Sequence, residues 1–258
     1  MSTQVKTIAS RDNPLLMRLR KLAGDPAAYR KLGEVWIEGE HLCSAFVLRG
    51  GSAPQAVISE AGWQTPSLRA IASTAASVVV IPEALMAGLS ALESPALLGF
   101  ALPWAGPGEL DALAPSVVLD RLQDAGNVGN ILRSASAFGF TQVVAIKGTA
   151  ALWSSKVLRA GLGAHFGLRL VEVANGEALA ALRVPMLATS SHAARAIHEA
   201  KLPWPCAWVM GHEGQGVAPA LMQRCVESLG IPQPGGEESL NVAAAAAVCL
   251  YESARQRG

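Results

Sequence analysis

The sequence predicts an α/β protein made of two domains, and three observations support this. Short runs of branched apolar residues alternate along the chain with longer segments whose apolar residues recur at helical spacing. A connection rich in proline and glycine, from Pro103 to Pro115, divides this alternation in two. With 258 residues, 51% of them hydrophobic, the chain can form two cores. We therefore expect domains at residues 1–105 and 115–258.

The first predicted domain opens with a basic segment. Leucines at positions 15, 16, 19 and 22 recur at helical spacing, so a helix would bury them and turn its charged residues to solvent. Such a face could bind phosphates, although an ordinary solvated helix explains the charges equally well. The candidate phosphate-binding residues here are Arg11, Arg18, Arg20 and Lys21.

The rest of this domain alternates strand and helix patterns, as small α/β domains do. Strands are expected at 35–37, 56–58, 78–81 and 97–102, and helices at 41–48, 66–73 and 82–89.

The second domain repeats the same alternation. Its expected strands are 117–119, 142–146, 168–173, 185–189, 207–210 and 228–231. Its expected helices are 128–138, 154–161, 177–182, 219–226 and 239–255. Asn127 and Ser239 precede two of these helices and are the residue types that cap helix N-termini.

Three polar segments follow strands in this domain: 127–133, 211–216 and 231–241. In the first, Asn130 and Arg133 lie on a different helix face from the apolar residues, so packing does not account for them. Ligands of open α/β sheets bind beyond the carboxyl ends of strands. The sequence therefore places a candidate site there.

Composition excludes several other classes of protein. A net charge of +1 argues against a uniformly basic nucleic-acid binder, but allows a local patch. The four cysteines form no C-x-x-C pair and the five histidines have no ligand spacing, so we expect neither a metal site nor disulfides. The longest apolar run, 242–251, is too short to span a bilayer, and charges at Lys6, Arg11 and Arg18 interrupt any signal peptide. We expect a cytoplasmic protein that does not enter membranes.

The three polar segments together resemble a known family. They read N-x-G-x-I-x-R-x-A-x-A-F-G at 127–139, G-x-E-x-x-G at 211–216, and I-P followed by S-L-N-V and L-Y-E between 231 and 252. These are similar to the signature motifs of the SpoU (TrmH-like) branch of the SPOUT RNA methyltransferases. Weaker similarity at 8–14 and 38–39 resembles the substrate-binding domain, itself like a ribosomal protein, that many ribosomal RNA members carry.

The resemblance implies a SPOUT α/β-knot domain: a mostly parallel sheet with a deep trefoil knot, dimeric through that domain. It also implies transfer of a methyl group from S-adenosylmethionine (SAM) to a ribose 2′-hydroxyl in RNA, most simply ribosomal RNA. By carry-over the catalytic residues are Asn127, Arg133, Glu213, Ser239 and Asn241. The cofactor-binding residues are Met210, Gly211, Gly214, Ile231, Pro232 and Leu240, and Arg159 joins the RNA-binding residues.

The role of Arg133 needs care, because a guanidinium has no acceptor atom and rarely loses its proton. We expect it to position phosphate and stabilise the oxyanion rather than to act as a base. Ala125 stands where the family usually has proline, and Ala243 where serine is common. The alternatives are a transfer RNA substrate, or a knotted RNA-binding protein without methyltransferase activity.

Overall fold

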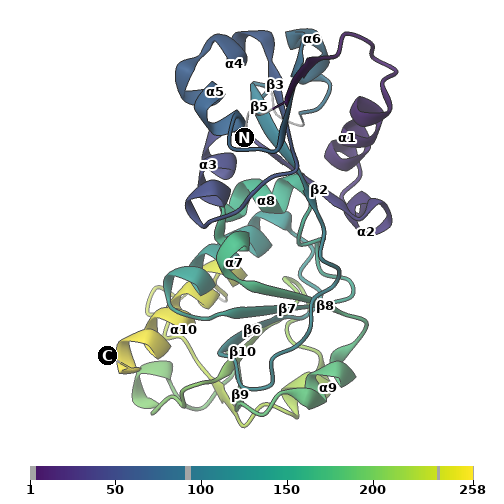
Figure 1. Ribbon diagram of the computed structural model, residues 1–258. Coiled ribbons are helices and arrows are strands. Elements are labelled where there is room, and N and C mark those ends of the chain that lie inside the picture. Colours follow the sequence, from purple (N-terminus) through teal and green to yellow (C-terminus); the bar gives the residue numbers. More distant parts are fainter. Residues whose placement is uncertain (1–3, 91–93, 237–238, 258) are drawn as a thin grey trace. The chain divides into compact units, whose positions relative to one another are not determined.

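The computed structural model describes residues 4–90, 94–236 and 239–257 (Figure 1). The chain packs as two compact units. The first comprises Met1–Gly106 with Trp153–Phe166, and the second Pro107–Leu152 with Gly167–Gly258. The expected domains at 1–105 and 115–258 differ from these units in two respects, since Trp153–Phe166 packs with the first unit and the second unit already begins at Pro107.

The first unit contains a five-stranded sheet in the order β1-β4-β3-β5-β2. The pairs β1–β4 and β4–β3 are parallel, whereas β5 runs antiparallel to both β3 and β2. The strands are β1 (Gln4–Thr7), β2 (Glu34–Glu38), β3 (Gln55–Ser59), β4 (Ser77–Ile81) and β5 (Leu98–Pro103). The four predicted strands are confirmed. The edge strand β1 was not predicted, because its residues are polar or exposed and lack an apolar alternation.

The first unit contains the helices predicted for its segments, and in addition α2 (Ala28–Leu32), α4 (Glu60–Gln64) and a 3₁₀ helix, η1 (Ala164–Gly167), that were not predicted. Helix α1 (Pro14–Gly24) buries the four leucines named above, and Asn13 caps it by accepting a hydrogen bond from Leu15 N at 3.0 Å. The others are α3 (Glu40–Leu48), α5 (Pro66–Ala72), α6 (Glu83–Ala87) and α8 (Ser155–Gly161).

The second unit contains a six-stranded sheet in which every pair of neighbours is parallel, in the order β11-β9-β10-β6-β7-β8. This confirms the predicted α/β class with a mostly parallel sheet. The strands are β6 (Ser116–Leu119), β7 (Gln142–Ile146), β8 (Arg169–Val173), β9 (Met186–Thr189), β10 (Ala207–Met210) and β11 (Glu227–Leu229).

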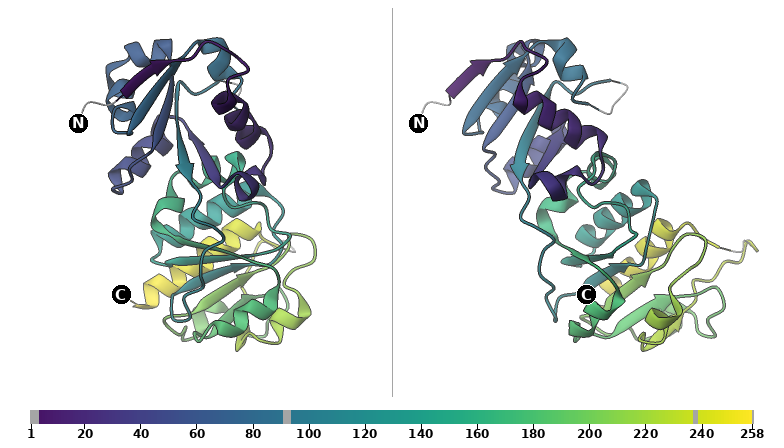
Figure 2. Two further views of the ribbon diagram at one scale, coloured as in Figure 1. Left: turned by 45° about the vertical axis from the view of Figure 1, so that its right-hand side comes forward. Right: turned by 90° about the vertical axis from the view of Figure 1, so that its right-hand side faces the viewer.

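Two layers of helix cover this sheet. Helices α7 (Ala125–Ala137) and α10 (Val242–Arg257) lie side by side in all three views (Figures 1 and 2). Trp208 points to their side, because its indole Nε1 donates to Ser253 Oγ on α10 at 2.9 Å. The alternate residues Val118 and Val209 instead pack in a cluster with Leu179 and Leu221. Those leucines come from η2 (Gly176–Ala181) and α9 (Pro219–Met222), which lie on the opposite face.

Both predicted helix caps in this unit are wrong by a few residues. Asp124 caps α7, with extended backbone and a side chain that accepts from Asn127 N at 2.7 Å, so Asn127 lies inside the first turn. Asn241, rather than Ser239, caps α10 by accepting from Ala243 N at 2.9 Å and Ala244 N at 3.3 Å. In each case two capping residue types stand close together in the sequence, and spacing alone does not choose between them.

Two other predicted helices differ from expectation, one in its type and the other in its length. The segment expected at 177–182 is a 3₁₀ helix, and α9 ends at Met222 instead of Val226. Val226 N donates to Met186 O at 2.8 Å and so already leads into β11. Within the described residues, no helix is long and apolar enough to cross a membrane.

The first turn of α7 gives a stability prediction. Ala125 occupies position N1, where proline fits because the amide has no partner within the helix, and the extended backbone of Asp124 suits a residue before proline. Ala125→Pro should therefore stabilise the protein by roughly 0.4–1 kcal/mol, mainly by restricting the unfolded chain. Thermal unfolding measures this. A lower melting temperature would contradict the assigned N1 position.

Candidate active site

Four loops meet at one edge of the sheet in the second unit. They follow β11, β9, β10 and β6, which are consecutive neighbours and parallel, so their carboxyl ends share that edge. A pocket of about 360 Å³ opens there. It is lined by Thr189, Ser190, Ser191, Gly211, His212, Glu213, Gly216, Val217, Ile231, Gln233, Ser239, Leu240, Asn241, Val242 and Ala245.

Glu213, on the loop after β10, holds the start of α7. Its carboxylate accepts hydrogen bonds from Gln123 N at 3.2 Å, Asp124 N at 3.1 Å and Asn127 Nδ2 at 3.3 Å. Partial burial alone would raise its pKa. Hydrogen bonds from the backbone amides of Glu213, Asp124 and Gln123, and from Asn127, outweigh burial and lower the pKa of Glu213 below its ordinary value. Glu213 is therefore ionised at neutral pH and serves as an acceptor.

Asn127 extends this network to α10. Its Oδ1 accepts a hydrogen bond from Asn241 Nδ2 at 3.0 Å, while Asn241 Oδ1 accepts from the first amides of α10. Each amide thus uses its oxygen toward a donor and its nitrogen toward an acceptor, which fixes the orientation of both side chains. The polar chain Glu213–Asn127–Asn241 joins three segments, and Asn127 lies more than eighty residues before each of its two partners in the sequence.

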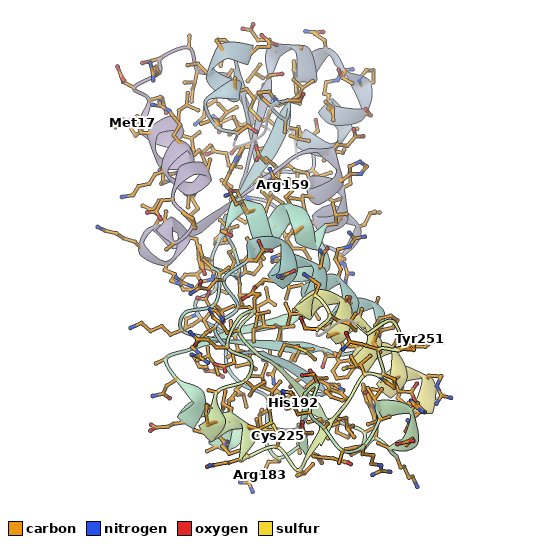
Figure 3. All side chains as sticks on the ribbon, turned by 180° about the vertical axis from the view of Figure 1, so that it is seen from behind. Met17, Arg159, Arg183, His192, Cys225 and Tyr251 are labelled. Carbon is orange, nitrogen blue, oxygen red and sulfur yellow. The ribbon has the colours of Figure 1, made fainter. Side chains whose placement is uncertain are left out.

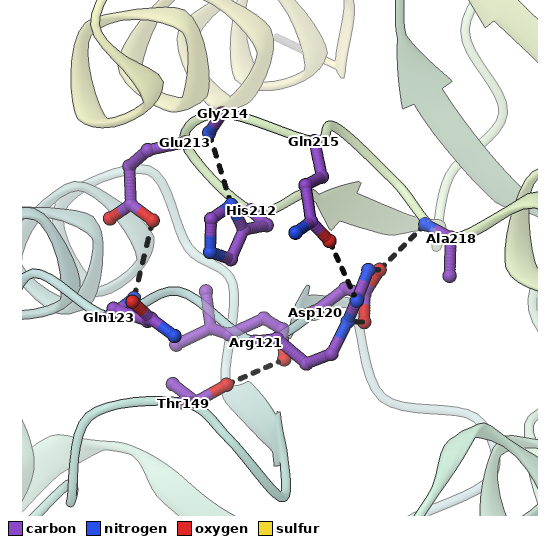
Figure 4. A network of polar contacts seen from close by, with 10 residues as sticks. Asp120, Arg121, Gln123, Thr149, His212, Glu213, Gly214, Gln215 and Ala218 are labelled. Carbon is purple, nitrogen blue, oxygen red and sulfur yellow. Dashed lines mark hydrogen bonds and ion pairs between the residues drawn. The ribbon is translucent and has the colours of Figure 1, made fainter.

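A second group of polar contacts holds the C-terminal end of the loop after β10 (Figure 4). Asp120, only 2% exposed, accepts from Ala218 N at 2.7 Å and from Arg121 Nε at 2.9 Å. Arg121 Nη1 donates in turn to Gln215 Oε1 at 3.3 Å. Arg121 has a φ of 60°, a left-handed conformation that costs energy for a residue other than glycine. The ion pair and the loop contact compensate for that cost.

Gly211 lets two backbone segments meet at the pocket. A Cβ atom at this position would lie 2.2 Å from both Gly216 C and Val217 N, so any side chain would force the loop apart. His212 and Gly216 close the loop through His212 N to Gly216 O at 3.0 Å and Gly216 N to His212 O at 2.8 Å. The pocket wall is therefore a tight loop whose backbone stands close to whatever binds.

The structure brings most of the predicted catalytic residues together. Glu213, Ser239 and Asn241 line the pocket, and Asn127 is hydrogen-bonded to two of them. Arg133 lies exposed on α7, about 9 Å further along the helix axis than Asn127 by the rise per residue. Among the described residues, no side chain or carbonyl forms a hydrogen bond with its guanidinium, so it stands free to meet a substrate.

The predicted cofactor residues divide into two groups. Gly211, Ile231 and Leu240 line the pocket, whereas Pro232 lines an adjoining cavity of about 910 Å³. Met210 is buried at the end of β10, and Gly214 is exposed on the loop, with its amide donating to His212 Nδ1 at 3.0 Å. Neither Met210 nor Gly214 is among the residues that line either cavity.

Several lining residues were missed from the sequence, among them Thr189, Ser190, Ser191, His212 and Gln233. Thr189 ends β9 and the two serines directly follow it, so the same rule about strand ends that singled out the other loops could have found them. Gln233 gave no such signal, because a glutamine in a loop rich in proline and glycine is typical of a solvated turn.

The predicted RNA-binding residues belong to the first unit. Arg11 and Lys21 are exposed, while Arg18 forms an ion pair with Glu34 at 2.5 Å and Arg20 donates to the carbonyl of Arg11. Arg159 is exposed on α8 and is labelled in Figure 3. The basic residues of α1 thus lie on the side away from its buried leucines, as predicted. Two of the four have partners within the protein.

Comparison with known proteins gives consistent relatives. An uncharacterized tRNA/rRNA methyltransferase of Synechocystis sp. is 30% identical over 269 residues, covering 100% of this chain and 96% of that protein. The 23S rRNA (guanosine-2′-O-)-methyltransferase RlmB of Yersinia pestis is 35% identical over 160 residues. That match spans 58% of this chain and 65% of RlmB.

Solved structures agree in fold. A crystal structure of an RNA 2′-O ribose methyltransferase is 29% identical with a TM-score of 0.80, covering 98% of this chain and 99% of that one. The SpoU methyltransferase AviRb of Streptomyces viridochromogenes, crystallised with the cofactor AdoMet, is 23% identical with a TM-score of 0.85, covering 95% of this chain and 98% of that one. The model of the SpoU rRNA Methylase family matches residues 114–251, which contain the whole polar network described above. The chain therefore belongs to the SpoU rRNA methylase family.

Proposed function

We propose that this protein transfers a methyl group from SAM to a ribose 2′-hydroxyl in RNA, with ribosomal RNA as the substrate. The observation that carries the proposal is the polar chain Glu213–Asn127–Asn241 beside the pocket, at the strand ends where the family match lies. Membership of a methylase family, and a relative named as a guanosine-2′-O-methyltransferase, support the reaction type.

The residues present fit such a cofactor. Gly211, which lines the pocket, lets the loop after β10 close tightly on itself, and the side chains of Ile231, Leu240 and Val242 offer an apolar wall. SAM, when bound, supplies an electrophilic methyl group. Its positively charged sulfonium would be attracted to the ionised carboxylate of Glu213, which lines the pocket.

The chain's own residues would act on the RNA hydroxyl by orientation. Asn127 and Asn241 fix each other, and Glu213 fixes Asn127, so the polar groups beside the pocket are pre-organised. Arg133, whose guanidinium is free, would bind the phosphate next to the target ribose and stabilise the developing oxyanion. Ser239 lines the same pocket and would donate or accept a hydrogen bond near the ribose.

Methyl transfer in vitro tests the substrate class. Purified protein, radiolabelled SAM and total RNA from cells lacking the enzyme should label ribosomal RNA. Label found in transfer RNA alone would favour the alternative substrate. An absence of both label and SAM binding would favour the RNA-binding protein without activity. We also propose that the reaction takes place in the cytoplasm, because the proposed substrate is ribosomal RNA.

The basic residues of the first unit would bind the RNA backbone. Arg11 and Lys21 have exposed side chains, whereas Arg18 is paired with Glu34. Arg11→Ala with Lys21→Ala should weaken RNA binding and lower the slope of log K against log salt by roughly 0.7–0.9 for each lost phosphate contact. Binding measured at several salt concentrations checks this. Arg18→Ala should change the slope less, and an unchanged slope in the double variant would remove this face from the interface.

We also propose a knotted C-terminal region. Gly230 N donates to Arg195 O at 2.8 Å, and Ile197 N donates to Gly230 O at 2.8 Å. The chain after β11 is therefore hydrogen-bonded to the segment that follows β9. That segment then meets α10, where Leu202 N donates to Gln256 Oε1 at 2.9 Å. Contacts of this one segment with both the chain after β11 and α10 support the trefoil knot that the family resemblance implies.

A homodimer through α10 is part of the same proposal. Ala244, Val248 and Tyr251 recur at helical spacing on an exposed face, and the two larger side chains are 39% and 54% exposed. Tyr251 packs edge to face against Phe138 of α7, with ring centroids 5.7 Å apart, and is labelled in Figure 3. A row of exposed apolar side chains along one face of a helix is typical of a subunit interface.

Val248→Asp should therefore convert the protein from dimer to monomer, because an interface cannot bury an unpaired carboxylate without a large cost. Sedimentation equilibrium at several concentrations measures this. The matched control is Leu113→Asp, an exposed apolar residue in the second unit but outside α7 and α10, which should leave the mass unchanged. A monomeric wild type would contradict the proposal.

A further inference from the structure

The carboxamide of Gln233 contains a buried oxygen that the protein leaves unpaired. Its Oε1 is inaccessible to solvent and has no hydrogen-bond partner among the residues that the structure describes. The backbone carbonyl of the same residue accepts from Gly236 N at 3.1 Å, so this carbonyl, unlike the side-chain oxygen, has a hydrogen-bond partner. Buried polar atoms in folded proteins are nearly always hydrogen-bonded, and an exception in a binding pocket indicates a ligand group.

Gln233 occupies a defined place in the site. It lines the 360 Å³ pocket together with Glu213, and it also lines the adjoining 910 Å³ cavity, which Glu213 does not reach. Gln233 therefore lies at the end of the pocket that continues into the second cavity. Glu213 is the one carboxylate among the described lining residues of the pocket. Positively charged groups of a ligand would therefore be attracted to the end of the pocket at Glu213. Arg195 and Glu199 line the adjoining cavity, but their charged groups have partners in the Glu227 carboxylate and the Ala196 amide. A neutral ligand group therefore suits Gln233.

The chemistry of a carboxamide selects that neutral group. A glutamine side chain presents an acceptor and a donor in one plane, which matches the amino group and adjacent ring nitrogen of adenine. Ile231, Leu240 and Val242, which line the same pocket, give the apolar surface that a flat base requires. We propose that Gln233 reads the adenine of the cofactor, with Oε1 accepting from the 6-amino group and Nε2 donating to a neighbouring ring nitrogen. The inference rests on the proposed function.

Calorimetric binding of two ligands tests it without any turnover. The ligands are S-adenosylhomocysteine and its analogue in which the 6-amino group is replaced by hydrogen. Wild-type protein should bind the analogue roughly 10- to 100-fold more weakly, the discrimination expected of a bidentate glutamine–adenine contact. Gln233→Met, of similar size but without the amide, should bind both ligands with nearly equal and weakened affinity. Gln233→Glu keeps the acceptor and should keep discrimination for the amino group with a lower overall affinity.

The control variant is Gln223→Met, an exposed glutamine in the same unit that lines neither cavity. It should retain the wild-type ratio, and thermal unfolding confirms that each variant is folded. An unchanged ratio in a folded Gln233→Met would overturn the assignment. If Gln233→Met weakens S-adenosylhomocysteine but not 5′-methylthioadenosine, which lacks the amino-acid part, Gln233 binds the amino acid and the assignment is again wrong. Failure of the wild type to bind any of these ligands would instead contradict the proposed function itself.

Discussion

Arg133→Ala is expected to lower the rate of methyl transfer by roughly 100- to 1,000-fold, the usual effect of removing one donor that stabilises an oxyanion. The guanidinium is exposed and, within the described part of the chain, forms no hydrogen bond with protein, so its removal leaves no group without a partner. Folding and the affinity for SAM should therefore remain at wild-type values. Single-turnover kinetics and calorimetry measure the two effects separately.

Two further variants sharpen this result. Arg133→Lys keeps the positive charge but loses the planar fork that binds phosphate oxygens in pairs, and should recover only part of the rate. Arg169→Ala removes another exposed arginine of the same unit, at β8, and should be nearly as active as wild type. Unchanged turnover in Arg133→Ala would remove Arg133 from the proposed site.

Glu213→Ala is expected to impair both cofactor binding and rate. The carboxylate accepts from Gln123 N, Asp124 N and Asn127 Nδ2, and its loss releases the loop after β10 from the start of α7. The pocket wall and the orientation of Asn127 would be lost together, so we expect at least a 10-fold weaker Kd for SAM and at least a 100-fold lower rate. Asn127→Ala keeps the backbone contacts of Glu213 and should affect the rate more than the Kd.

The pH dependence follows from the direction of the Glu213 pKa. This pKa lies below the ordinary value of 4.5, so the contribution of the ionised carboxylate is complete above pH 4.5 and is lost only as pH falls through the lower, folded-state value. Titration of Glu213 should therefore add no pH dependence to the cofactor affinity between about pH 5 and 8. Loss of affinity in wild type near pH 6 that is absent in Glu213→Gln would contradict the role of a permanently ionised acceptor.

Sequence patterns predicted much of the framework, because apolar periodicity is a direct consequence of burial. The strands β7 and β10 have the predicted bounds, and the leucines of α1 are buried as their spacing indicated. Prediction failed where competing local interactions have similar energies. Asp124 and Asn127 are both capping types, and only the folded chain shows that α7 starts after Asp124, whose side chain accepts from Asn127 N.

Features that depend on distant segments were beyond the sequence. The hydrogen bond between Asn127 and Asn241 joins residues 114 positions apart, and no spacing rule predicts such a pair. The packing of Trp153–Phe166 with the first unit likewise depends on tertiary contacts, such as the edge-to-face pair of Phe46 and Phe166 with centroids 5.2 Å apart. The left-handed conformation of Arg121 could not be predicted from the sequence either. No local pattern indicates it, and the contacts of Arg121 with Asp120 and Gln215 form only in the folded chain.

The central claim, that the methyl group is transferred to a ribose oxygen in RNA, is tested most directly by the position of the methyl group in the product. RNA methylated by the purified protein with isotope-labelled SAM would be digested to nucleosides and analysed by mass spectrometry. We predict label in a 2′-O-methylnucleoside, whose fragmentation releases an unlabelled base and a labelled ribose, and a rate of labelling roughly 100- to 1,000-fold lower with Arg133→Ala. Label on the base, or none in any RNA under conditions where SAM binds, would contradict the account.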